Sequence, residues 1–185
     1  MGDEIGLHRA TVRIAPYHPE WAEHFRREEE LLLKLMGQTA LDIRHIGSTS
    51  IVGMPAKPIV DILVGLETLS LLEPFVENLN QIGYQDRGDG GEPGRRYFVK
   101  GPEEKRTHHL NFCELNGIFW TRHIVFRDYL EMHPGTASQY AALKQELAAK
   151  FANDRRAYTN GKEKFVLSIL NLAMNAPPAP AKSSR

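Results

Sequence analysis

The segment RHIGSTSIVGMPAKPIVDILV, residues 44–64, holds the residue types and spacing best suited to chemistry. Three small hydroxyl residues, Ser48, Thr49 and Ser50, follow Gly47 directly after the short predicted strand 43–46. Such a turn at the end of a strand leaves backbone N–H groups free to face an anion, and the hydroxyl groups can add donors. The turn therefore predicts a phosphate-binding corner.

A cation and a carboxylate accompany this turn. Lys57 supplies a positive charge in the loop that follows, and Asp61 lies on the next apolar run. A carboxylate at this place could hold a Mg²⁺ ion that bridges phosphate oxygens. A structural interpretation is also open, because hydroxyl residues commonly cap helices and Asp61 could lie at the edge of a sheet.

A second polar face is predicted on a later strand. Alternation places His109 and Asn111 on one side and Leu110 and Phe112 on the other, as in a strand that half lines a polar cavity. His109 could bind a metal ion, together with Asp61, or donate to phosphate, and Asn111 could orient a ligand. Alternatively, both side chains are hydrogen-bonded within the fold.

Further basic residues are candidates for contact with an anionic ligand, since forked arginine donors suit phosphate or carboxylate. They are Arg95, Arg96, Arg106 and, close to the start of the last helix, Lys162. The alternative is a solvated surface for the arginines and helix packing for Lys162. Cys113 alternates onto the side of His109, but no neighbouring residue in the sequence indicates an activated thiolate.

Composition restricts the classes of partner. The chain has 185 residues and a formal net charge of zero, so no overall field favours nucleic acid, and any anion binding must be local. A single cysteine excludes an internal disulfide and fits a reducing compartment. The sequence shows no signal-like or membrane-spanning apolar stretch. We therefore expect a cytoplasmic protein whose partner is a small phosphorylated ligand or nucleotide.

Hydrophobic periodicity predicts one domain over residues 1–175, helical from about 119 onward, and a tail over 176–185 with a disordered composition. The glycine-rich stretch 87–95 is expected to be a mobile loop or hairpin connection. Predicted strands cover 11–14, 43–46, 59–64, 96–100 and 108–115, with 59–64 central. Predicted helices cover about 20–36 and 69–79, then from 119 to before 133, then to about 151, and about 159–174.

Two neighbours in the first carboxy-terminal helix are expected to bond elsewhere. Arg127 and Asp128 are adjacent in sequence, and adjacent side chains do not face each other on a helix. We therefore expect each to contact another segment. His123 and His133 are interpreted as structural.

The glycine-serine turn, followed after a loop by a strand aspartate, resembles the signature of the DNA polymerase beta-like nucleotidyltransferase superfamily. More closely, the chain is similar to the GrpB family from about Val12 to Leu172, because several separated motifs occur in the right order. They are PYHPEW, HIGSTS, AKPIVDILV, FRDYLEMHP and AYTNGKEKF. The resemblance implies an α/β (α+β) fold, a nucleotidyltransferase-like mixed β-sheet flanked by helices.

The resemblance also implies strand carboxylates that hold two metal ions, and here the chain departs from the pattern. Asp61 is present, but Leu63 stands where the second acid would be. Side chains two apart on a strand share a face, so an apolar group is expected beside Asp61. The run from His108 to Phe112 matches the strand of the third acid, with His109 and Asn111 in its place.

Two functions are compatible with this pattern. One is a Mg²⁺-dependent transferase that moves a nucleotidyl or related phosphoryl group to a small acceptor, with Ser48 and Ser50 on the phosphates and Asp61 on the metal. The alternative is a binding module for a nucleotide or coenzyme that has lost the full metal centre. Because GrpB-like domains in the family also occur fused to a dephospho-coenzyme A kinase, coenzyme A-related ligands are included.

Overall fold

The computed structural model describes residues 5–175 and contains a five-stranded mixed sheet. The strands lie in the order β1-β2-β5-β4-β3. Their bounds are Asp42–Ile46 for β1, Val60–Leu66 for β2, Tyr84–Asp86 for β3, Arg95–Lys100 for β4 and His108–Glu114 for β5. β2 and β5 run parallel, and the other neighbours are antiparallel. The predicted 59–64 strand is therefore an interior one.

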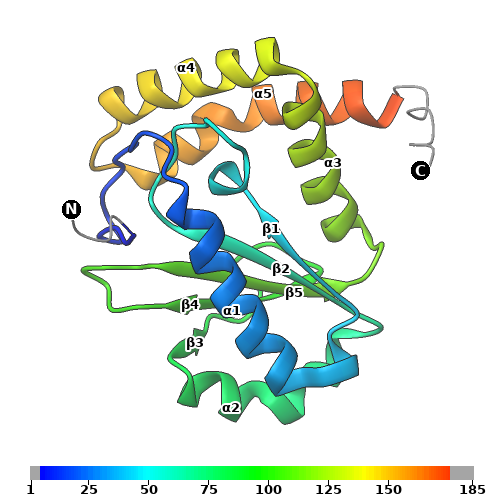
Figure 1. Ribbon diagram of the computed structural model, residues 1–185. Helices are drawn as coiled ribbons and strands as arrows, with labels where there is room; N and C mark the ends of the chain where they lie inside the picture. The colour runs from blue at the N-terminus through cyan, green and yellow to red at the C-terminus, as the bar shows by residue number, and fades with distance from the viewer. Residues whose placement is uncertain (1–4, 176–185) are drawn as a thin grey trace.

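Helices surround this sheet. They are α1 Glu20–Met36, α2 Val76–Gln81, α3 Ile118–Met132, α4 Pro134–Lys150 and α5 Arg155–Asn175, with 3-10 turns at Gly37–Thr39, Ser48–Ser50 and Leu69–Phe75. Figure 1 shows α1 crossing one face of the sheet, with α3, α4 and α5 gathered at one end. The expected mixed sheet flanked by helices, with a helical carboxy-terminal portion, is confirmed.

Alternation along β2 divides the core between the two faces of the sheet. Val60, Ile62 and Val64 pack with Trp21 and Leu32 of α1. The opposite face of β2 carries the residues on which the candidate chemistry depends. There Leu63 is 0% exposed and belongs to an apolar cluster with Ile46, Cys113, Phe119 and Trp120, on the same face as Asp61.

The amino-terminal segment differs from its prediction. Residues 11–14 form no strand; the segment is tied by the isolated bridges Leu7↔Arg106 and Ala15↔Ala56. Between them, the Val12 N–H donates to the carbonyl of Ala152, so this stretch follows the turn between α4 and α5 instead of a sheet edge.

Two predicted helices also have different bounds. Of the predicted 69–79 helix, Leu69–Phe75 is a 3-10 helix that contains Pro74, and the rest belongs to the short α2. The last helix begins at Arg155, earlier than predicted, because the Asp154 carboxylate accepts the Ala157 N–H at 2.9 Å and caps it. The 87–95 stretch connects the antiparallel pair β3 and β4, as a hairpin connection would. The predicted tail lies outside the described residues.

Membrane insertion is not indicated by any helix of residues 5–175, since none is long and apolar enough to cross a bilayer.

A buried ion pair fastens α1 to the sheet. Glu28 is 6% exposed, and its carboxylate accepts the Tyr84 hydroxyl at 2.8 Å and the Lys100 ammonium at 2.7 Å. Because the three side chains come from α1, β3 and β4, this network fixes the helix across the face opposite Asp61.

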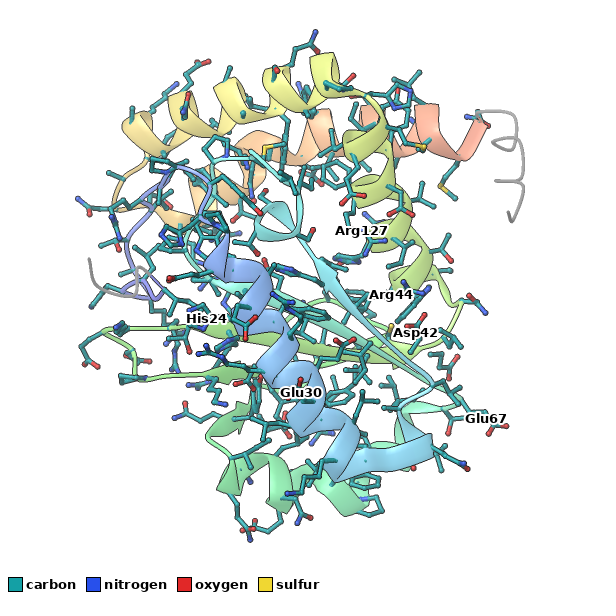
Figure 2. The ribbon with its side chains drawn as sticks, viewed as in Figure 1. His24, Glu30, Asp42, Arg44, Glu67 and Arg127 are labelled. Carbon is teal, nitrogen blue, oxygen red and sulfur yellow. The ribbon has the colours of Figure 1, made fainter. Side chains whose placement is uncertain are left out.

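Removal of this acceptor tests the role of the network. We expect Glu28→Ala to lower the free energy of unfolding by about 2–3 kcal/mol, because Lys100 and Tyr84 then lose their partner in a largely dry site. Urea denaturation measures the change. Glu30→Ala, at an exposed position of the same helix (Figure 2), is the control and should cost less than about 0.5 kcal/mol. Equal losses in the two variants would contradict the assignment.

Candidate functional site

The glycine-serine turn lies where β1 ends and faces Asp61 on β2. Gly47 has φ 70°, and a Cβ atom there would lie 2.6 Å from Oδ2 of Asp61. The position therefore requires glycine both for its backbone conformation and for the carboxylate beside it. The 3-10 turn Ser48–Ser50 follows, and the first N–H groups of such a turn lack acceptors within it.

The three hydroxyl groups of the turn have partners within the fold. The Thr49 hydroxyl is buried and hydrogen-bonds to Nε2 of His45 at 2.9 Å. The Ser50 hydroxyl donates to the Gly47 carbonyl at 2.7 Å. Ser48 hydrogen-bonds to Tyr140, whose pKa burial raises despite the opposing effect of that bond. Ligand contacts by these hydroxyls stay predictions, and each would require exchange of an existing partner.

Asp61 and His109 form a pair across the parallel strands β2 and β5. The two residues are in register, and Nδ1 of His109 lies 2.8 Å from Oδ1 of Asp61. Burial alone would raise the pKa of Asp61, but the hydrogen bond from His109 and the nearby positive charges lower it overall. Burial lowers the pKa of His109 despite Asp61. His109 is therefore a neutral imidazole that donates through Nδ1 to the carboxylate of Asp61.

The carboxylate of this pair remains accessible. The side chain of Asp61 is 33% exposed, so solvent reaches its carboxylate. The ring of Tyr97 meets His109 edge-on at 5.5 Å between centroids. Asp61, His109 and Tyr97 together form a polar surface on the face of the sheet opposite α1.

Asn111 and Arg95 lie on this face but bond to each other. The amide of Asn111 donates to the Ile62 carbonyl at 3.1 Å and accepts from Arg95 at 2.8 Å. The guanidinium of Arg95 also lies 4.5 Å from the Tyr97 ring centroid and 5.4 Å from that of Phe119. These contacts agree with the structural alternative and leave a ligand role for either residue as a prediction.

The structure does not bring Arg96 to Asp61. Arg96 alternates onto the opposite face of β4, where Nε donates to both carboxylate oxygens of Asp86 at 3.0 and 2.9 Å. A further bond of 3.3 Å reaches Glu73. Its charge is therefore compensated by two acids.

Three lysines converge near the turn and Asp61. Lys57 and Lys162 were expected there, and their ammonium groups lie 5.6 and 4.5 Å from the Tyr158 ring centroid. Lys144, which sequence reasoning missed, is 2% exposed and donates to the Pro55 carbonyl at 2.6 Å. Within residues 5–175, none of the three forms an ion pair with a carboxylate.

Burial and neighbouring positive charges disfavour the charged form of all three lysines. Burial lowers the pKa of Lys57 to about 8, with Arg155 and Lys162 adding to the effect. Burial likewise lowers the pKa of Lys162 to about 8, with Arg155 adding and Asp61 opposing. The pKa of Lys144 falls to about 7 through burial and the charges of Lys162 and Lys57. Positive charge thus exceeds negative charge at this corner.

A cavity of about 380 Å³ lies beside His109. Its lining includes Tyr97 and four arginines, of which only Arg106 was predicted from the sequence; the others are Arg9, Arg87 and Arg155. A small adjoining space adds Lys57 to the same group. The sequence signal that could have indicated Arg155 is its place in the run RRAYTNGK, about two helical turns before Lys162 and so on the same helix face.

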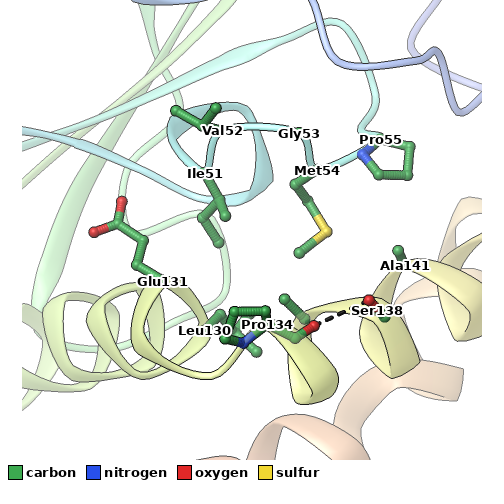
Figure 3. Close-up of a pocket in the computed structure, with 11 residues that line it drawn as sticks. Ile51, Val52, Gly53, Met54, Pro55, Leu130, Glu131, Pro134, Ser138 and Ala141 are labelled. Atoms are coloured by element: carbon green, nitrogen blue, oxygen red, sulfur yellow. Dashed lines mark hydrogen bonds between the residues drawn. The ribbon is translucent and has the colours of Figure 1, made fainter.

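A second cavity, of about 400 Å³, lies elsewhere on the loop after the turn (Figure 3). Its lining is mostly apolar, from Ile51 and Met54 on the loop to Leu130 and Ala141 on the helices. The hydroxyl of Ser138 already donates to the Pro134 carbonyl at 3.0 Å. Without convergent polar groups, this cavity offers packing contacts instead of chemistry.

The expectation for Arg127 and Asp128 is wrong in part. Nε and Nη2 of Arg127 donate to Oδ1 of Asp128 at 2.8 and 2.6 Å, because the long arginine side chain folds back to its neighbour. The same guanidinium donates to the His45 carbonyl at 3.0 Å and so ties α3 to β1 (Figure 2). His123 and His133 bond to carbonyls of their own helix, as structural residues would.

The donor set does not fit the two-metal centre that the superfamily resemblance implies. Among residues 5–175 there is no group of three or more histidine, cysteine or acidic side chains placed to hold a metal ion. Leu63 fills the position of the second acid, and one oxygen of Asp61 is engaged by His109. Two-metal chemistry therefore has too few ligands here.

Comparison with known proteins identifies relatives along nearly all of the chain. A family model described as GrpB protein matches residues 11–172. UPF0157 protein YqkA of Bacillus subtilis (strain 168) is 42% identical over 158 residues, which cover 85% of this chain and 46% of YqkA. The glutamate-rich protein GrpB of Alkalihalophilus pseudofirmus is 39% identical over 171 residues, which cover 90% of this chain and 98% of that protein.

One of the longer relatives is named as a kinase. A dephospho-CoA kinase of Mycolicibacterium paratuberculosis is 28% identical over 181 residues, which cover 84% of this chain and 44% of the kinase. The chain thus spans less than half the length of YqkA and of this kinase.

A solved structure shares the fold. The crystal structure of the conserved protein GrpB from Enterococcus faecalis matches with a TM-score of 0.82 and 35% identity, covering 88% of this chain and 97% of that one. Together with the family model, which spans the glycine-serine turn, Asp61, His109 and Lys162, this agreement shows that the chain belongs to the GrpB family.

Proposed function

We propose that the protein binds a nucleotide or another phosphorylated small molecule at a lysine corner, which we define as Lys57, Lys144 and Lys162 beside Asp61. The observation that carries the proposal is an excess of positive charge largely withdrawn from water. Lys144 is buried, Lys57 and Lys162 are half-buried and interact electrostatically with Asp61, and none of the three forms an ion pair within residues 5–175.

Burial of uncompensated charge is costly, and a bound anion would relieve the cost. Ammonium groups that lose water without gaining a partner are disfavoured, as the lowered pKa values of all three lysines show. A phosphate group would supply negative charge and acceptor oxygens at once. The first N–H groups of the Ser48–Ser50 turn are further donors for the same oxygens.

Leu63 fills the place of the second acid. This favours a binding function without two-metal catalysis over nucleotidyl transfer. The alternative, transfer of a nucleotidyl group to a small acceptor with Mg²⁺, draws on the accessible carboxylate of Asp61 and on Gly47, which leaves room for it. Because one relative is named as a dephospho-CoA kinase, coenzyme A precursors belong among the ligands to be tested.

Calorimetric titration of ATP, GTP and coenzyme A precursors, with and without Mg²⁺, tests the proposal. We expect at least one of them to bind without Mg²⁺, and Lys162→Met to weaken its binding about tenfold or more, because a charge-assisted contact is lost. Lys164→Met, at an exposed position of the same helix, is the control and should bind as the wild type does.

Two results would decide against parts of this account. Failure of every anion to bind would reject both functions. Release of pyrophosphate from a triphosphate with Mg²⁺, abolished in Asp61→Asn, would reject the binding module and establish the transferase.

The lysine pKa values predict proton uptake on binding. At pH 8 the lysines near pKa 8 are partly deprotonated, and an anion raises their pKa, so the complex binds more protons than the free protein. At pH 6 all three lysines are already charged, and the uptake should disappear. Calorimetry at each pH in two buffers of different ionisation enthalpy measures it; equal apparent enthalpies at pH 8 would contradict the charge state assigned to the corner.

A further inference from the structure

We propose that an arginine cleft, defined as the cavity lined by Arg9, Arg87, Arg106 and Arg155, is a second anion subsite that takes a second phosphate group of the same ligand. This inference rests on the proposed function of the lysine corner. It specifies the ligand class as a small molecule with at least two phosphate groups, one for each subsite.

The cleft is assembled from four separate parts of the chain. Arg9 comes from the amino-terminal segment, Arg87 from the connection between β3 and β4, Arg106 from the turn before β5, and Arg155 from the start of α5. Their cavity has a volume of about 380 Å³, and none of the residues that line it, all described, is acidic. The fold therefore places four positively charged side chains around one cavity.

The charge of these arginines is only partly compensated. Glu103, which does not line the cavity, lies 2.8 Å from Arg9 and 4.0 Å from Arg106. Its side chain is exposed, so the pair with Arg9 is screened by solvent. Among the described residues, one surface carboxylate thus provides the ion pairs of these four guanidinium groups.

Arg106 is the most buried member and is held in place by neutral groups. It is 4% exposed, and its guanidinium donates to the Gly101 carbonyl and to Gln85 at 3.2 Å. Burial lowers the pKa of Arg106, and Arg87 and Arg9 add to that effect. A guanidinium fixed in this way, with part of its donor fork facing a cavity, suits a phosphate or carboxylate oxygen.

The two subsites are adjacent and share a small space of about 10 Å³. Lys57 and Arg155 line the same small space next to His109, which also contacts the larger cavity. Arg155 interacts electrostatically with both Lys57 and Lys162, and it hydrogen-bonds to Tyr97. One ligand could therefore place a phosphate at the lysine corner and a second among the arginines.

Calorimetry with inorganic phosphate and tripolyphosphate, without metal ions and at constant ionic strength, tests this inference on the full chain. We expect tripolyphosphate to bind the wild type about tenfold more tightly than phosphate, since it reaches both subsites. Arg87→Gln and Arg9→Gln should each remove several-fold of that gain while leaving the phosphate affinity within about twofold. Both residues are exposed, so these variants should fold.

Arg156→Gln is the matched control, because Arg156 is exposed and adjacent to Arg155 but does not line the cleft. It should leave the ratio of the two affinities unchanged. An equal ratio in wild type, Arg87→Gln and Arg9→Gln would overturn the second subsite while the lysine corner stands. Phosphate binding that is insensitive to Lys162→Met would instead reject the proposed function beneath it.

Discussion

An excess of positive charge, half-buried at Lys57 and Lys162 and buried at Lys144, is the constraint on which the candidate site depends. Asp61 lies between His109 on the neighbouring strand and the lysine corner, and its lowered pKa reflects these partners. The parallel pairing of β2 with β5 brings Asp61 beside His109, and α4 and α5 bring Lys144 and Lys162. The sheet thus supplies the carboxylate, and the carboxy-terminal helices supply two of the three lysines.

This arrangement also explains how the corner can bind an anion without a full metal centre. Leu63 packs into an apolar cluster where a second acid would be needed, so a pair of metal ions lacks ligands. Lysine ammonium groups are positively charged, as metal ions are, but they need no carboxylate ligands to hold them in the site. Gly47 keeps the backbone close to Asp61, because any side chain there would collide with the carboxylate.

Much of the site follows from short-range patterns. The period of two along strands placed Asp61 with Leu63, and His109 with Asn111, on shared faces, and the structure confirms both pairs. The same period separates Arg95 from Arg96, yet the sequence alone does not show which of them faces Asp61. Partners for Arg96 come from Asp86 and Glu73, which only the folded chain brings together.

The residues that sequence reasoning missed depend on tertiary structure. Lys144 shares a helix face with the buried Tyr140 and Leu147, at spacings of four and three residues, so a charge on an apolar stripe was a readable signal. Arg9 and Arg87 gave no such signal, because the cavity that they line with Arg155 forms only when distant segments meet. The start of α5 was missed because the Asp154 cap was not recognised.

The location of a bound anion tests the central claim most directly. A crystal soaked with tungstate, a phosphate analogue with strong anomalous scattering, would place it without reference to any assumed activity. The account predicts an anomalous peak within hydrogen-bonding reach of Lys57 and Lys162, beside the Ser48–Ser50 turn. A peak confined to surfaces away from these residues, or a corner in which all three lysines keep their present contacts at saturating tungstate, would contradict it.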